Sequence, residues 1–387
     1  MPPEQPPAEA SVEPSAGGRS RRRGVVGVVL LATAAAAAIF HLFTAGVTPL
    51  TALVQRPAHL AFMAILGFLG VGVMSVRGAD DPDRPTWRKV FLDWLPAVLL
   101  VAACIYLITQ NRELVARSGT STPLDLVFGA LAIVLVLELA RRATGWGLVT
   151  VCVLALAYGV AGPWLPGILS HRGYDLGRLV EHLYLSTEGL WGVPLGVSAD
   201  FVYLFILFGA VLEVAGGGAL LIALADKVAG RTRGGPAKTA AVASAFMGSL
   251  SGSAVANVVT TGSFTIPLMK KAGFKPFFAG AIEAAASTGG QLMPPVMGAG
   301  AFILATWTNI PYIEVALAAT VPAILYYVAL VMAIHFRAGR MGLEPSRTPN
   351  REPIADRVRR EGAIAEASQT ALRRDPQVVG GVFMDRS

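Results

Sequence analysis

The sequence predicts an all-α, polytopic membrane protein with about eight spanning helices, one re-entrant helical hairpin and one broken helix. Hydrophobic residues make up 54% of the 387 residues and charged residues only 15%, which is typical of a chain that crosses a bilayer several times. Several apolar runs approach the roughly 20 residues that a spanning helix needs. Residues 248–300 are also apolar, but they are crowded with Gly, Ser, Thr and Pro.

The chain opens with a Pro-, Ala- and Glu-rich segment, and we expect residues 1–23 to be a disordered cytoplasmic N-terminus. Arginines at its end precede the first apolar run, as they do in a secretory signal peptide. The apolar core of a signal peptide has about 7–15 residues, and the run here is longer. Its length therefore favours a retained first span over a cleaved signal.

Seven apolar runs are predicted to be uninterrupted membrane-spanning helices. They are Gly24–Phe43, Leu60–Val76, Phe91–Thr109, Leu124–Ala140, Trp146–Gly162, Ser198–Gly216 and Tyr312–Phe336. With the N-terminus in the cytoplasm, the loops rich in Lys and Arg all fall inside, in agreement with the positive-inside rule. These inner residues are Arg77, Arg84, Arg88, Lys89, Arg141, Arg142, Lys227, Arg231, Arg233 and Lys238.

The same rule constrains the stretch that is rich in helix breakers. Lys238 and the lysines at 270, 271 and 275 should lie on one side, so residues 239–269 must enter the membrane and return. We interpret this segment as a re-entrant hairpin with its tip near Gly252. Residues 277–310 then cross outward as a helix broken at 287–290 and at Pro294–Pro295.

Two flanking segments are predicted to lie outside the bilayer core. Apolar residues near helical spacing over 176–190 predict an amphipathic surface helix, with Tyr184 and Trp191 at the membrane interface, or an ordinary connecting helix. Residues 341–387 are polar and charged, which predicts a cytoplasmic tail.

Composition and motifs exclude several classes of function. The aromatic-basic interleaving of a nucleic-acid surface is missing, so no nucleic-acid partner is expected. The chain has no Walker A sequence, no Ser-His-Asp pattern and no zinc-ligand spacing, and we expect neither an enzyme nor a cofactor. Cys104 and Cys152 lie inside apolar runs and read as small buried residues.

The breaks offer a chemistry that suits a hard monovalent cation such as Na⁺, which prefers oxygen ligands. Ser251, Gly252 and Ser253 at the hairpin tip combine hydroxyls with carbonyls freed from helical pairing, and a second break follows at Ser287–Gly290. Helix N-termini at such breaks suit an anionic substrate. The alternative is that the small residues serve only close helix packing.

Glu283 lies in an apolar segment just before the second break. A carboxylate at membrane depth is by default a functional hypothesis, here a coupling group for a proton or cation. The alternatives are a side chain that faces a hydrated cavity, or an ion pair with Lys238 or Lys275.

Two long motifs carry a family resemblance, GGPAKTAAVASAFMGSLSGSAVANVVTTGSFTIPLMKKAGFKP and EAAASTGGQLMPPVMGAGAFILA. Residues 173–340 resemble the large membrane subunit of tripartite ATP-independent periplasmic (TRAP) transporters, in particular the permeases with fused small and large subunits. By this resemblance, residues 24–145 look like the four-helix small subunit and residues 146–340 like the first part of the large one.

The resemblance implies a secondary transporter in the bacterial inner membrane, driven by a Na⁺ gradient. A periplasmic binding protein, in the fused branch often of the TAXI type, would hand it an organic anion. Na⁺ ligands are then implied at Ser251, Gly252, Ser253, Thr288, Gly289 and Gly290. Substrate contacts are implied at Ser253, Asn257, Thr261, Pro294 and Pro295.

The chain departs from the family pattern, because the large subunit has two inverted repeats and only one is evident here. We expect a truncated or split permease whose second repeat comes from a missing segment or a partner chain. The alternative functions are a non-transporting membrane remnant or scaffold, and a dicarboxylate carrier that needs no binding protein.

Overall fold

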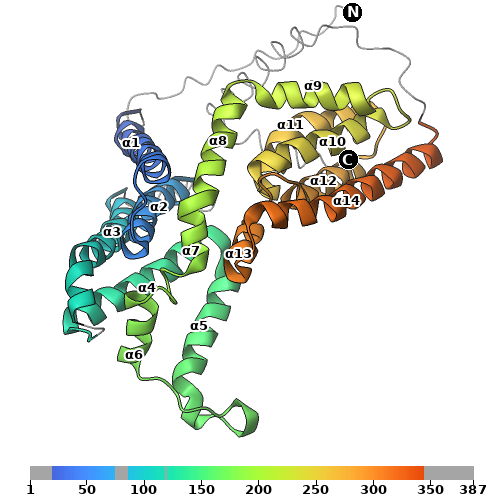
Figure 1. Ribbon diagram of the computed structural model, residues 1–387. Helices are drawn as coiled ribbons and strands as arrows, with labels where there is room; N and C mark the ends of the chain where they lie inside the picture. Colours follow the sequence, from blue (N-terminus) through green and yellow to red (C-terminus); the bar gives the residue numbers. More distant parts are fainter. Residues whose placement is uncertain (1–19, 75–85, 118–119, 344–387) are drawn as a thin grey trace, which may run out of the picture. The chain divides into compact units, whose positions relative to one another are not determined.

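The computed structural model describes residues 20–74, 86–117 and 120–343, and within these ranges the regular elements are helices, with no strand (Figure 1). The predicted all-α fold is confirmed. The N-terminal residues 1–19 and the predicted tail from 344 onward lie outside the described residues. The chain folds as two compact units, residues 1–196 and 197–387.

The first unit contains five long helices followed by short helical turns. The long helices are α1 (Ser20–Gly46), α2 (Ala52–Met74), α3 (Thr86–Ala116), α4 (Pro123–Thr144) and α5 (Trp146–Ala161). The short elements are η1 (Gly162–Trp164), η2 (Gly167–Leu169), α6 (Leu176–Val180), the π-helical η3 (Glu181–Leu185) and α7 (Val193–Val197).

The core of this unit lies where α2, α3 and α4 pack together around Tyr184 and Trp191, which are both fully buried. Tyr184 donates a hydrogen bond to the carbonyl of Ala103 (2.6 Å), and the indole of Trp191 donates to the carbonyl of Tyr184 (2.5 Å). The expectation that these two aromatics lie at the membrane interface is therefore wrong. Their polar atoms find partners inside the protein, which allows their large apolar rings to be buried.

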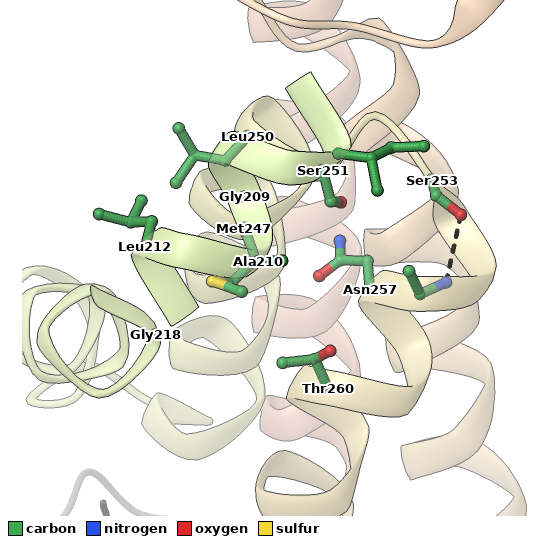
Figure 2. Close-up of a pocket in the computed structure, with 12 residues that line it drawn as sticks. Gly209, Ala210, Leu212, Gly218, Met247, Leu250, Ser251, Ser253, Asn257 and Thr260 are labelled. Carbon is green, nitrogen blue, oxygen red and sulfur yellow. Dashed lines mark hydrogen bonds between the residues drawn. The ribbon is translucent and has the colours of Figure 1, made fainter. Parts of the chain in front are cut away.

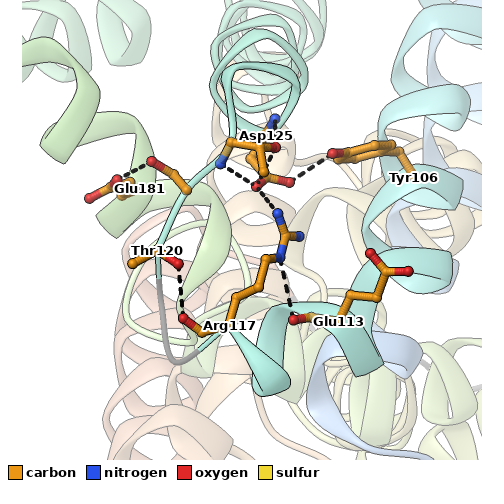
Figure 3. A network of polar contacts seen from close by, with 8 residues as sticks. Tyr106, Glu113, Arg117, Thr120, Asp125 and Glu181 are labelled. Carbon is orange, nitrogen blue, oxygen red and sulfur yellow. Dashed lines mark hydrogen bonds and ion pairs between the residues drawn. The ribbon is translucent and has the colours of Figure 1, made fainter.

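A capping motif sets the start of α4 and joins it to α3 (Figure 3). Thr122 caps the helix, Pro123 occupies the first turn, and Asp125 accepts a hydrogen bond from the Thr122 backbone N–H (2.7 Å). Tyr106 donates to Asp125 (2.8 Å), and Arg117 pairs with it (3.2 Å). The buried Asp125 carboxylate thus holds the α3–α4 connection.

The second unit is built around one helical hairpin and a broken helix. Its elements are the π-helical η4 (Ser198–Val202), α8 (Tyr203–Val214), α9 (Gly217–Ala229), α10 (Gly235–Ser251), α11 (Ala254–Lys271), α12 (Pro276–Gly289), η5 (Gly290–Leu292), α13 (Ala299–Thr308) and α14 (Tyr312–Arg340). Helix α10 packs against α9, α11, α12 and α14 (Figure 1). Alanines at 237, 240 and 241 are fully buried there, and their small side chains permit this close approach.

Seven helical stretches in the described ranges are long and apolar enough to cross a membrane: Val26–Gly46, Ala52–Gly70, Leu92–Leu114, Pro123–Thr144, Trp146–Trp164, Val193–Leu212 and Tyr312–Arg340. Each overlaps one of the seven predicted plain spans. The predicted broken helix corresponds to α12, η5 and α13, and none of these is long enough to cross by itself. Membrane entry of the α10–α11 hairpin remains a prediction.

Candidate functional site

The hairpin turns at Gly252. This residue ends α10 with φ of 61°, a left-handed conformation that glycine adopts without steric cost. A Cβ at this position would lie 2.1 Å from the carbonyl oxygen of Met297. Ser253 then caps α11, and its Oγ accepts a hydrogen bond from the backbone N–H of Ala256 (3.3 Å). The sequence SGS therefore encodes one helix end, one tight turn and one helix start.

The helix break begins where α12 ends at Gly289. Two consecutive tyrosines of α14 bind carbonyls near this end: Tyr326 donates to Ala285 (2.8 Å) and Tyr327 to Ala286 (2.7 Å). The carbonyl of Ala286 is among the last four of α12, which lack an intrahelical partner, and Tyr327 supplies one. Tyr326 adds a donor to the carbonyl one residue earlier. Gly289 is required here because a Cβ would lie 2.3 Å from the Tyr326 ring.

The hairpin and the break are in direct contact. A Cβ on Gly248 would lie 2.3 Å from the Cα of Gly290, so the two backbones touch. The carbonyl of Ser249 accepts a hydrogen bond from the backbone N–H of Val296 (3.1 Å). Tyr312, at the start of α14, donates toward the carbonyls of Pro295 (2.7 Å) and Val296 (2.6 Å) and anchors the loop after the break.

A pocket of about 250 Å³ lies beside the hairpin tip, against α8 and α9 (Figure 2). Its polar lining comes from the hairpin: Ser251, Ser253, Asn257 and Thr260. The rest of its lining is aliphatic or small: Ile206, Gly209, Ala210, Leu212, Gly218, Met247, Leu250 and Ala256. The Oγ atom of Ser251 is buried and has no hydrogen-bond partner among the described residues. A buried hydroxyl without a partner is costly and suits a site that binds a ligand.

Glu283 lies on the other side of the hairpin and is fully buried. Its carboxylate contacts four hydroxyls, from Ser244 of α10, Thr261 and Thr265 of α11, and Ser287 of α12. Both alternatives for this residue are therefore wrong: it faces no hydrated cavity, and it pairs with neither Lys238 nor Lys275.

Lys238 is instead bonded to Thr232 (3.0 Å) and to His335 (3.0 Å). Burial lowers the pKa of its ammonium group. This lysine therefore belongs to a polar contact between the start of α10 and the last turns of α14, separate from Glu283.

The structure divides the predicted site residues among three places. Ser251, Ser253 and Asn257 line the pocket, with Gly252 at the turn between the two serines. Thr261 faces Glu283, while Thr288 is exposed and donates to the carbonyl of Ala284 in its own helix (2.8 Å). The remaining predicted residues lie in the break and its loop, outside the pocket lining: Gly289, Gly290, Pro294 and Pro295.

Sequence reasoning missed Ser244, Thr265 and the two tyrosines. One signal was present, because Asn257, Thr261 and Thr265 recur every four residues and so share one face of α11. The fully buried Asn257 donates to the carbonyl of Ser244 (2.8 Å), which ties the two arms of the hairpin together. No comparable spacing indicates the tyrosines, which lie some 40 residues from the carbonyls they bind.

The fold and the site define a multi-pass helical membrane protein with a hairpin, a broken helix and a pocket between its helices, which is a transporter-type arrangement. Residues 131–371 match the family described as "Tripartite ATP-independent periplasmic transporter, DctM component". The match covers more than half of the sequence, and the chain belongs to this family. DctM proteins are transporter permeases and not enzymes.

Curated relatives agree with this assignment. A protein of Sinorhizobium fredii described as uncharacterized is 32% identical over 174 residues, which cover 41% of this chain and 41% of the relative. The C4-dicarboxylate TRAP transporter large permease protein DctM of Pseudomonas aeruginosa is 33% identical over 134 residues, covering 35% of this chain and 31% of the relative.

The isethionate TRAP transporter permease protein DctMQ of Oleidesulfovibrio alaskensis is 31% identical over 173 residues, covering 45% of this chain and 24% of the relative. The chain therefore spans less than half the length of each of these relatives.

Proposed function

We propose that the chain is a membrane permease component of a Na⁺-coupled TRAP transporter that imports an organic anion delivered by a periplasmic binding protein. Family membership supports a transport role. The observation that carries the proposal at the site is the buried Ser251 Oγ at the hairpin tip, beside the pocket, which has no hydrogen-bond partner in the described part of the chain. Na⁺ prefers oxygen ligands of this kind.

The same pocket also suits an anionic substrate, for a different physical reason. No basic side chain lines it, but α11 begins at its edge, and helix N-termini favour negative charge. We propose that Na⁺ and the start of α11 together compensate the substrate's carboxylate. Asn257 and Thr260 offer further hydrogen bonds, and the aliphatic wall from α8 would contact the carbon skeleton.

The finer organisation is also part of the proposal. We place the protein in the bacterial inner membrane with a cytoplasmic N-terminus, as a fused small- and large-subunit permease that works with a TAXI-type binding protein. A second hairpin and broken helix would come from a further segment or chain, in line with the partial coverage of the relatives.

Binding of radioactive Na⁺ to the purified full chain tests the ion site. Loss of the Ser251 hydroxyl should weaken Na⁺ binding by about tenfold in Ser251→Ala. Ser263→Ala is the matched control, because Ser263 lies on the same helix pair but is exposed and bonds only to the carbonyl of Thr260. Equal Na⁺ affinities of wild type and Ser251→Ala would contradict the ion-site assignment.

Uptake into proteoliposomes tests the coupled function, with succinate and isethionate as probes, in the presence and absence of a purified periplasmic binding protein from the same organism. Uptake that requires both an inward Na⁺ gradient and the binding protein supports the proposal. Na⁺-driven uptake without the binding protein would favour the independent dicarboxylate carrier. Absence of uptake after a second repeat has been supplied would favour the non-transporting remnant.

A further inference from the structure

The network around Glu283 joins three helices through one carboxyl group. Ser244 of α10 approaches Oε1 at 3.0 Å, and Ser287 of α12 approaches it at 3.2 Å. From α11, Thr265 approaches Oε2 at 2.5 Å, and Thr261 also contacts Oε1. All five side chains are buried to 1% exposure or less. Water therefore does not solvate this carboxyl group.

No positive charge compensates Glu283 in the part of the chain that the structure describes. None of its four partners is basic, and no ion pair in the described ranges includes it. On α14, the titratable group that interacts electrostatically with Glu283 is Tyr327, whose hydroxyl already binds the carbonyl of Ala286. A fully buried carboxylate without a compensating charge is strongly unfavourable.

The network also has fewer hydrogens than contacts. The four hydroxyls carry four hydrogens, yet they make four contacts with the carboxyl group, two with helix carbonyls, one between Ser244 Oγ and Thr261 Oγ1 (3.1 Å) and one with Asn257 Oδ1 (3.4 Å). The two carbonyl contacts join Thr261 Oγ1 to Asn257 (2.7 Å) and Thr265 Oγ1 to Thr261 (3.0 Å). A hydroxyl has one hydrogen to donate, so each threonine can donate either to the helix carbonyl one turn earlier or to Glu283, but not to both. A fifth hydrogen on the carboxyl group lets Glu283 donate to Thr261, which then donates on to Asn257.

We propose that this cluster is a proton-binding site, in which Glu283 carries a proton while the hairpin is packed against α12. The site is separate from the pocket at Ser251, whose lining includes none of the five residues. The occupant is a proton and not Na⁺, because the hydroxyls contact the carboxyl oxygens directly. Release of the proton leaves a charge among three helices, and this couples deprotonation to separation of the hairpin from α12.

Infrared spectroscopy of the purified full chain tests the proposal directly. A protonated carboxylic acid has a carbonyl stretch distinct from that of a carboxylate. We expect this band at neutral pH in the wild type, sensitive to exchange into D₂O and absent from Glu283→Gln. A difference spectrum that contains only carboxylate bands would overturn the proposal.

Unfolding of the same variants provides a second readout. Gln has nearly the same size as Glu, is neutral and can both donate and accept, so it mimics the protonated acid. Glu283→Gln should therefore unfold with an equilibrium constant within about threefold of the wild type, in Na⁺ or in choline. Strong destabilisation of Glu283→Gln in both salts would show that the ionised carboxylate is the form that the fold requires, and it would overturn the proton assignment.

Neither measurement depends on transport or on the Ser251 site. A failure of the proton assignment therefore leaves the proposed permease function intact, and the reverse also holds. Gly262→Ala adds an independent probe of the same packing, because a Cβ there would lie 3.1 Å from Cγ of Glu283. We expect this variant to shift the acid band without removing it, and a spectrum identical to that of the wild type would contradict the assignment of the band to Glu283.

Discussion

The two units each bury a carboxylate, and the two carboxylates have opposite kinds of partner. Asp125 in the first unit pairs with Arg117 and accepts from Tyr106 and Thr122, at the capped start of a helix (Figure 3). The polar contacts of Glu283 in the second unit are, among the described residues, all with hydroxyls. The first arrangement includes a countercharge, while the second includes none among the described residues.

This difference separates a structural network from one that can change state. An ion pair at a helix cap holds one geometry, because either partner alone is unfavourable. A carboxyl group among hydroxyls can gain or lose a proton and is placed where three helices meet. The following substitutions test the contrast, from the largest expected effect to the smallest.

Gly252→Ala should have the largest effect on stability. The new Cβ meets the Met297 carbonyl at 2.1 Å and also sits at positive φ, so we expect a loss of about 3 kcal/mol or more in the free energy of unfolding. Gly70→Ala in the first unit is the control, because a Cβ there meets nothing within 4 Å. Chemical denaturation in detergent micelles measures both, and equal effects would show that the hairpin tip is not tightly packed.

Asp125→Asn should cost about 1–3 kcal/mol, because it removes the countercharge of Arg117, whose side chain is only 25% exposed. Glu283→Gln should cost less than about 1 kcal/mol by the same measurement. The contrast between the two carboxyl groups predicts this order. The reverse order would mean that Glu283 is the ionised group of the two.

Tyr327→Phe should cost about 1 kcal/mol, because the carbonyl of Ala286 at the end of α12 loses its donor. Tyr326→Phe is the matched variant, since its hydroxyl binds the neighbouring carbonyl of Ala285. Hydrogen exchange of the amides near Gly289 should rise in both variants. Unchanged exchange would show that the tyrosines do not stabilise the break.

Ser251→Ala should leave stability within about 0.5 kcal/mol of the wild type or slightly raise it, because the hydroxyl that is removed has no partner among the described residues. Its effect should appear only in ligand binding. A thermal melt without added Na⁺ measures this smallest effect. A clear loss of stability would reveal a structural role for the hydroxyl and weaken its assignment to an ion site.

The spans and the breaks could be predicted from the sequence because they depend on local composition. Long apolar runs set the seven plain spans, and Gly252 marks the hairpin turn through its special backbone conformation. Which residues of α11 line the pocket and which contact Glu283 could not be predicted. Asn257 and Thr261 lie one turn apart on the same face of α11, yet Asn257 lines the pocket while Thr261 contacts Glu283. This difference follows from packing against α8 and α12.

The contacts of the buried aromatic residues also could not be predicted from the sequence. Tyr184 and Trp191 combine an apolar ring with a polar group, which suits a membrane interface. In the first unit, however, carbonyls of α3 and of their own segment bind these polar groups inside the protein. The contacts of Tyr326 and Tyr327 also depend on how α14 lies along α12. Only the folded chain brings such distant residues together.

The paired tyrosines of α14 have a mechanical consequence. Two neighbouring hydroxyls engage two neighbouring carbonyls of α12, so the attachment fixes registry as well as proximity. A slide of one helix past the other by a single residue, about 1.5 Å, would misalign both bonds at once. The two hydrogen bonds therefore oppose sliding of α12 along α14, because any such movement must break both of them.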